Sequence, residues 1–312
     1  MYLLKNTKSA FPTTSLASRF SLLLVAMLPL IASCQGETAR AQGPAGLELQ
    51  SEDYREARSH FQTQLVRQQP APQQGEMLQA PTGAVQVIYS STSSLRAWLS
   101  SVPTTGTNAK RPAVIFLHGG FAIGGGDWSM GHPYQQAGYV VMMPVLRAEN
   151  GQAGNYSMFY NEVSDVMAAV SYLSKVPYVD ASHIYLAGHS VGGTLVQLCA
   201  LTSSRFKAAA SFSGAPDPIS WSKGQPEVVP FDGSQIKEFQ MRSSLAFATS
   251  FKCPTRLYYG DKEEWCATPS QATSERAKTK GLDVEAVSVA GDHFSAVPEE
   301  IKQSIAFFQS HQ

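Results

Sequence analysis

The sequence predicts an α/β fold with a mostly parallel central sheet, helices on both faces of the sheet and a small cap insertion. Continuous apolar runs such as "AVIFLHGG" at 113–120 end in glycine, which is typical of strands buried on both faces. Segments with the 3.6-residue periodicity of helices alternate with these runs, and this order indicates parallel strands joined by helical crossovers. Between one such strand and one such helix stands "GHSVGG" at 188–193, a tighter turn than a simple connection needs.

The expected elements follow one another along residues 85–312. Alternating apolar and polar residues predict paired edge strands at 85–90 and 95–102. The other strands are expected within 113–120, 139–147, 183–188, 207–214, 255–261 and 283–291. Helices are expected at 161–176, 192–203 and 298–312. Residues 217–251 interrupt the alternation, and we expect them to form the cap.

Residues 1–33 have the pattern of an export signal. Basic residues precede the apolar run "SLLLVAMLPLI" at 21–31, which is shorter than the roughly 20 residues that span a bilayer. The run ends in "IASC", which resembles the lipobox of bacterial lipoprotein signal peptides. The resemblance implies cleavage before Cys34, lipidation of Cys34 and a membrane anchor in the periplasm or at the cell surface. An ordinary secretory signal cut nearby is the alternative, and either signal exports the protein from the bacterial cytoplasm.

Residues 34–84 are expected to tether the folded domain to this anchor. A polar stretch at 35–50 comes first, the spacing of apolar residues predicts a short helix within 51–67, and a Pro- and Gln-rich connector follows. The catalytic domain is expected at 85–312. The 24 basic and 24 acidic side chains balance, so the charge gives no reason to expect nucleic acid as a partner.

Ser190 in the turn "GHSVGG" is the candidate nucleophile. A serine that stands above the end of a sheet needs a strained strand-to-helix turn in which neighbouring backbones crowd together. Side chains at positions 188 and 192 would clash there, which explains Gly188 and Gly192. The helix that starts at Val191 would direct its N-terminal N–H groups toward the reacting centre.

A serine hydroxyl needs a base, and in this arrangement the base comes late in the chain, after an acid. His293, in "VAGDHFSAV" directly after a predicted strand, fits this order. The acid must reach the imidazole nitrogen that faces away from Ser190. The stretch "LYYGDKEEW" offers Asp261, Glu263 and Glu264, and the residues alone do not choose among them.

Residues 85–310 resemble the α/β-hydrolases, in particular the branch of the prolyl oligopeptidases and dienelactone hydrolases. The resemblance is carried by "AVIFLHGGFA", "YVDASHIYLAGHSVGGT", "YYGDKEEW" and "GDHF". In that branch the acid is usually an aspartate three residues after the glycine that ends the strand. Counted from Gly260, this position is Glu263. The resemblance therefore implies a triad of Ser190, His293 and Glu263, with glutamate in place of aspartate and Asp261 as the alternative acid.

Acyl transfer passes through a tetrahedral intermediate whose oxyanion is stabilised by preset N–H donors. One donor is expected from Val191, the residue after the nucleophile. The second is expected from the loop "HGGFAIGGG", with Gly120 as first choice and Phe121 as second. The glycine run at 124–126 lacks the Lys and Ser or Thr of a phosphate-binding loop, and no cysteine pair has zinc-ligand spacing. We expect neither a metal nor a cofactor.

Two loops are candidates for substrate binding. The cap residues Trp221, Phe231 and Phe239 either line an acyl or alcohol pocket or anchor the cap to the core. Arg147 and Tyr156, which follow the strand at 139–147, could also reach the site. Arg147 would bind a substrate carboxylate there, or it forms a structural ion pair.

The cysteines after the export signal are expected to be structural. Cys199 lies in the helix after Ser190 and should be a buried apolar residue. Cys253 and Cys266 could form a disulfide in an oxidising compartment.

These features predict an exported serine hydrolase that cleaves small carboxylic esters through an acyl-enzyme intermediate. A serine peptidase acting on short peptides is the alternative, although we expect no large propeller before the domain of the kind that prolyl oligopeptidases carry. A lipoprotein that retains the fold and only binds a ligand or partner is a third hypothesis. Ser190, His293 and the glycine-rich loop argue against it.

Overall fold

The computed structural model describes residues 46–77, 79–90, 93–101 and 109–312 of the chain. The expected export signal at 1–33 and the expected lipidation site Cys34 lie outside these residues. The chain divides into two compact units, Met1–Ala39 and Arg40–Gln312, and the described residues all belong to the second. Among them, no helix has both the length and the apolar character that a membrane span requires.

One eight-stranded sheet forms the centre of the domain, with the strand order β1-β2-β4-β3-β5-β6-β7-β8. The strands are β1 (Ala84–Ser90), β2 (Leu95–Ser100), β3 (Arg111–Leu117), β4 (Val140–Pro144), β5 (Val179–His189), β6 (Ala209–Phe212), β7 (Thr255–Gly260) and β8 (Val284–Val289). The β1–β2 and β2–β4 pairs are antiparallel, and all other neighbouring strands are parallel. The predicted α/β class with a mostly parallel sheet is therefore confirmed.

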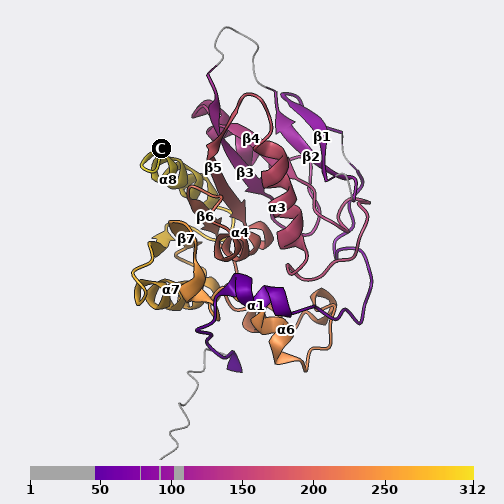
Figure 1. Cartoon of the computed structure of the whole chain (residues 1–312), viewed down its shortest axis with the longest axis vertical. Coiled ribbons are helices and arrows are strands. Elements are labelled where there is room, and N and C mark those ends of the chain that lie inside the picture. Colours follow the sequence, from indigo (N-terminus) through magenta and orange to yellow (C-terminus); the bar gives the residue numbers. More distant parts are fainter. Residues whose placement is uncertain (1–45, 78, 91–92, 102–108) are drawn as a thin grey trace, which may run out of the picture. The chain divides into compact units, whose positions relative to one another are not determined.

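Helices cover both faces of this sheet (Figure 1). The helices are α1 (Tyr54–His60), α2 (His132–Gln136), α3 (Glu162–Leu173), α4 (Val191–Thr202), α5 (Pro218–Ser222), α6 (Ile236–Gln240), α7 (Glu264–Lys278) and α8 (Val297–Gln309). Helices α3 and α4 contribute to the apolar core on one face, whereas α2 and α8 contribute to the core on the other. Neither α2 nor α7 was expected from the sequence.

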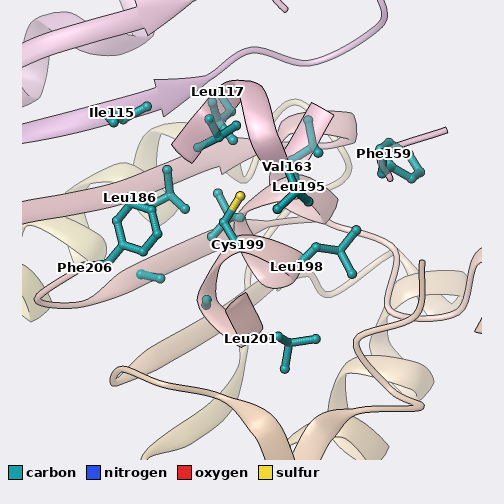
Figure 2. Close-up of a cluster of buried hydrophobic side chains, with 14 of the residues drawn as sticks. Ile115, Leu117, Phe159, Val163, Leu186, Leu195, Leu198, Cys199, Leu201 and Phe206 are labelled. Carbon is teal, nitrogen blue, oxygen red and sulfur yellow. The ribbon is translucent and has the colours of Figure 1, made fainter. Parts of the chain in front are cut away.

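The carboxyl ends of the parallel strands all lie at one edge of the sheet, where loops can bring distant residues together. Helix α4 packs across the sheet from this edge, and its apolar side chains contact strands β3 and β5 (Figure 2). Cys199 belongs to this core and is fully buried, as expected (Figure 2). Cys253 and Cys266 are free, so the disulfide that the sequence would allow does not form.

The segment before the sheet is packed against the domain, which differs from the expected tether at 34–84. Helix α1 is present but spans seven residues, capped by the side chain of Asp53. Leu47 and Tyr54 are fully buried, and the Tyr54 hydroxyl donates to the carbonyl of Met241 at 2.8 Å. Beyond α1, Leu65 forms an antiparallel bridge with Phe231 of the cap. These tertiary contacts explain why the helix ends earlier than its apolar spacing suggested.

The predicted cap is built from short helices between β6 and β7, among them α5 and α6. Phe231 and Phe239 are buried and meet edge to face, with ring centroids 4.9 Å apart. These two aromatic residues therefore anchor the cap, and they do not line a substrate pocket.

Arg242 ties the cap to the segment before the sheet. Its side chain is fully buried and pairs with Glu238 at 2.6 Å. The guanidinium also donates to the hydroxyl of Thr63 and to the carbonyl of Ser157. A buried guanidinium is costly unless its donors are satisfied, so this network fixes three separate parts of the chain in one arrangement.

Glu300 on α8 is fully buried, and neither carboxylate oxygen has a hydrogen-bond partner in the described part of the chain. Burial, helped by the negative charge of Glu263, raises its pKa from 4.5 to about 8. The folded protein thus keeps this acid neutral under conditions in which the unfolded chain ionises it.

We expect Glu300→Gln to become progressively more stable than the wild type as the pH rises from about 5 to about 8. Because the folded pKa lies above the unfolded one, the stability due to this proton is present at low pH. It is lost as pH rises toward the folded pKa, by at most about 1.4 kcal/mol per pH unit. Thermal melts across this range measure the difference, with Glu299→Gln on the same helix as the control. A Tm difference that does not change with pH would contradict the assignment.

Candidate active site

Ser190 lies at the turn between β5 and α4, at the carboxyl edge of the sheet. Its backbone has φ 56° and ψ −115°, a conformation that non-glycine residues rarely adopt. A Cβ on Gly192 would come within 2.2 Å of the carbonyl oxygen of Leu117, and one on Gly188 within 2.8 Å of the Gly192 backbone. The crowding predicted for this turn is thus present, and helix α4 starts at Val191 as expected.

Three of the predicted site residues form one hydrogen-bonded chain. The Nε2 atom of His293 lies 3.0 Å from Ser190 Oγ, and Nδ1 lies 2.6 Å from Glu263 Oε1. A carboxylate that accepts from Nδ1–H leaves Nε2 free to accept the serine proton. The geometry therefore suits proton transfer from Ser190 to His293.

Glu263 is held as an anion by its surroundings. Burial alone would raise its pKa, but hydrogen bonds from His293, Ser213 and the Gly260 N–H outweigh burial and lower the pKa. Ser213, whose hydroxyl donates to Glu263 Oε2 at 2.5 Å, was not among the site residues expected from the sequence. Its position near the end of the strand expected within 207–214 is the sequence signal that could have indicated a role. In the structure it lies directly after β6, with φ 48°.

The other two carboxylates of this loop have different surroundings. Asp261 accepts a hydrogen bond from the backbone N–H of Gly291 at 3.0 Å and thereby links the two loops that follow β7 and β8. Glu264 is an exposed residue at the start of α7. Among the described hydrogen bonds, neither side chain contacts His293.

His189 fills the variable position in the serine turn, and it also contacts His293. Its Nε2 donates to the backbone carbonyl of His293 at 2.8 Å, and the two imidazole centroids are 4.6 Å apart. Burial, together with the nearby His293, lowers the pKa of His189 to about 4. His189 is therefore a neutral support beneath the His293 loop, a role that the sequence alone did not indicate.

The backbone N–H groups of Gly120 and Val191, both near Ser190, have no hydrogen-bond partner within the described residues. The loop that carries Gly120 passes beside Ser190, since a Cβ on Gly119 would lie 3.6 Å from Ser190 Cβ. Gly120 has φ +70°, which favours glycine. The N–H of Phe121, the second choice, already donates to the side chain of Gln73 at 3.3 Å.

A cluster of buried polar residues packs against the loop that carries Gly120. His118 and Glu149 are both buried and pair at 3.0 Å. Burial disfavours the charged imidazole, but the Glu149 carboxylate outweighs it and raises the pKa of His118 to about 9. The side chain of Asn150 accepts a hydrogen bond from the N–H of Ile123 and donates to the carbonyls of Ile123 and Glu76. Residues from three chain segments thus fix the loop.

Two adjoining pockets open beside Ser190. The first, of about 310 Å³, is lined by Ser190, Ser220, Trp221, Gln225, Trp265 and His293. The second, of about 270 Å³, is lined by Ala215, Asp217, Ser220, Trp221, Glu264, Trp265, Thr268 and Pro269. The two share Ser220 and both tryptophans, so they form one continuous cleft. Trp221 therefore faces the site, unlike Phe231 and Phe239.

Arg147 and Tyr156, the two candidate substrate-binding residues from the loop after β4, have structural contacts. Arg147 forms a two-point ion pair with Asp165, with distances of 2.8 and 2.6 Å, so the structural alternative for this residue is the one observed. Tyr156 is buried and packs edge to face against Phe121, with centroids 5.3 Å apart.

In the described part of the chain, no group of three or more His, Cys, Asp or Glu side chains is arranged to hold a metal ion.

Solved structures with the same fold include peptidases and esterases. Dipeptidyl peptidase 4 of Porphyromonas gingivalis matches with a TM-score of 0.63 and 18% identity over 73% of this chain. The chain spans only 35% of that peptidase. Est1E of Butyrivibrio proteoclasticus matches with a TM-score of 0.56 and 21% identity, over 74% of this chain and 99% of Est1E. A putative dienelactone hydrolase from Klebsiella pneumoniae matches with a TM-score of 0.55 and 15% identity, over 72% and 98% of the two chains.

These similarities confirm the α/β-hydrolase fold. No curated protein sequence matches the chain. The family model of the prolyl oligopeptidases matches residues 130–308, which include Ser190, Glu263 and His293. Because this match covers more than half of the 312 residues, the chain belongs to the prolyl oligopeptidase family of serine hydrolases.

Proposed function

We propose that this serine hydrolase cleaves carboxylic esters, with Ser190 as nucleophile, His293 as general base and Glu263 as the acid of the triad. The observation that carries the proposal is the hydrogen-bonded chain from Glu263 through His293 to Ser190. The strained backbone of Ser190 and the free N–H groups of Gly120 and Val191 support it. A protein that only binds a ligand would not need this combination.

In the first half of the reaction, Ser190 Oγ attacks the ester carbonyl carbon while its proton passes to His293 Nε2. The π electrons of the carbonyl move to its oxygen, which becomes the oxyanion. The N–H groups of Gly120 and Val191 are our candidates for stabilising it, and a donor of this kind contributes roughly 3 kcal/mol. Glu263 stabilises the imidazolium that forms.

The intermediate then collapses to the acyl-enzyme. The carbonyl re-forms, the bond to the alcohol oxygen breaks, and that oxygen takes the proton from His293 Nε2. Water enters next, gives a proton to Nε2 and attacks the acyl carbon. In the second intermediate the bond between the acyl carbon and Ser190 Oγ breaks, the carboxylic acid leaves, and His293 Nε2 returns the proton to Oγ.

The cleft favours a substrate with an apolar group. Trp221, Trp265 and Pro269 supply apolar walls, and a cleft of this kind excludes water from a bound acyl group. The carboxylate of Asp217 is already used, because it caps α5 and accepts from Ser220. It is also buried, and its hydrogen bonds within α5 account for its position without a cationic substrate.

A peptidase that acts on short peptides is the second candidate. The observation in its favour is Glu264, an exposed carboxylate that lines the same cleft and could pair with the ammonium group of a peptide. Activity on p-nitrophenyl esters compared with aminoacyl nitroanilides separates the two candidates.

We also propose that the enzyme is exported and anchored to the bacterial membrane by lipid on Cys34. The support is the signal-like sequence of residues 1–33 and its "IASC" end.

Replacing the nucleophile tests the proposal directly. We expect Ser190→Ala to abolish ester hydrolysis and labelling by a fluorophosphonate probe, because no other described hydroxyl contacts His293 Nε2. Circular dichroism and Tm show whether the variant is folded. Substantial residual turnover in a folded variant would overturn the assignment of Ser190.

Replacing each carboxylate of the loop after β7 tests the acid. We expect Glu263→Gln to lower kcat by about 10⁴, because an amide cannot stabilise the imidazolium and favours the wrong tautomer. Asp261→Asn and Glu264→Gln serve as matched controls and should lower kcat far less, since neither contacts His293. All three are compared on one activated ester. If Asp261→Asn is the variant with the greatly lowered kcat, Glu263 is not the acid.

The N-terminus of the native protein tests the anchor. We expect mass spectrometry of protein from bacterial membranes to show a mature chain that starts at an acylated Cys34 and partitions into detergent. Cys34→Ser should move the protein to the aqueous phase. An unmodified N-terminus at another residue would show that the signal is an ordinary secretory one.

A further inference from the structure

Two exposed aromatic side chains stand beside His293. Six large hydrophobic side chains in the described part of the chain are exposed, and only two of them are aromatic: Trp265, 45% exposed, and Phe294, 73% exposed. Both lie against His293, with ring centroids 6.0 Å away for Trp265 and 5.1 Å for Phe294. Single exposed hydrophobic residues are ordinary on a protein surface, but two aromatic rings against one imidazole are not explained by chance exposure.

The fold does not need the Phe294 ring. The turn that holds His293 and Phe294 is fixed by Asp292, whose carboxylate accepts from the N–H groups of Phe294 and Ser295. The Ser295 hydroxyl also donates to it at 2.7 Å. With most of its surface open to solvent, the ring anchors nothing in the core. Its contacts are instead with His293 and, at 5.8 Å between centroids, with His189.

The position of His293 in the reaction decides which part of a substrate meets these rings. In the first intermediate, the oxyanion faces the N–H donors and the departing oxygen faces His293 Nε2, from which it takes its proton. The alcohol portion of the ester must therefore lie beside the imidazole. Trp265 lines the pocket that contains Ser190 and His293, so it borders the space in which that portion lies.

We propose that Phe294 and Trp265 form a leaving-group site that selects esters of aromatic alcohols. The site rests on the proposed function, because it requires Ser190 and His293 to act as nucleophile and base. Aromatic rings pair favourably edge to face or offset, and two largely exposed rings offer such contacts to a third.

The test compares two esters of the same short acid, the benzyl ester and the 2-methoxyethyl ester, whose alcohols have similar acidity. The wild type should prefer the benzyl ester in kcat/KM, a constant that includes the step in which the alcohol leaves. Phe294→Ala should lower the ratio of benzyl to methoxyethyl kcat/KM by about tenfold, the size expected for loss of an aromatic pair. Trp265→Ala should lower it as well.

The matched control is Ile88→Ala, which removes another exposed apolar side chain from β1, at the opposite edge of the sheet from β8. It should leave the ratio unchanged. Labelling of Ser190 by a fluorophosphonate, whose leaving group is fluoride, gives the reactivity of the triad in each variant, and ester rates are normalised to it.

Three outcomes would count against the site. If the wild type is labelled and cleaves both esters but Phe294→Ala keeps the wild-type ratio, the leaving-group site is wrong and the proposed function stands. If Ile88→Ala lowers the ratio as much as Phe294→Ala does, the leaving-group site is also wrong and the proposed function stands. If the wild type is neither labelled nor active on either ester, the proposed function fails and the site fails with it.

Discussion

The contact between Gly192 and the carbonyl of Leu117 is the constraint on which the site depends. A single added carbon at Gly192 would come within 2.2 Å of that oxygen, so the start of α4 and the end of β3 have no room to move closer. Ser190 precedes this contact on one chain segment and Gly120 follows it on the other. Ser190 and the N–H groups of Gly120 and Val191 are therefore held in register by backbone packing, which is stiffer than a side-chain contact.

Much of the fold and of the candidate site could be predicted from the sequence, because the sheet strands and the turn at Ser190 each have a local cause. Buried parallel strands require continuous apolar runs, and the turn at Ser190 requires glycine on both sides, so the sheet, α4 and the crowded turn between β5 and α4 were predicted correctly. His293 was predicted because it lies directly after the last expected strand. The residues alone left the acid open among Asp261, Glu263 and Glu264, and only the family resemblance implied Glu263. The structure brings Glu263, not Asp261, to His293.

What could not be predicted depends on contacts between distant segments. Helix α7 carries Pro269 and many Ser and Thr residues, so its pattern gave no helical signal, and its position comes from packing beside β8. Ser213 and His189 support Glu263 and His293 through single hydrogen bonds that join residues 50 and 104 positions apart. The segment around α1 has the composition of a polar linker because only a few of its residues, such as Leu47 and Tyr54, enter the core.

The packing of that segment changes where the catalytic domain begins. A shortened protein that starts at β1 would contain all eight strands together with Ser190, Glu263 and His293, and by motif it would look complete. It would nevertheless leave the guanidinium of Arg242 without Thr63 and the loop at Ile123 without the Glu76 carbonyl that Asn150 links to it. For anyone who expresses or crystallises this enzyme, the practical boundary lies upstream of Leu47, well before the first strand.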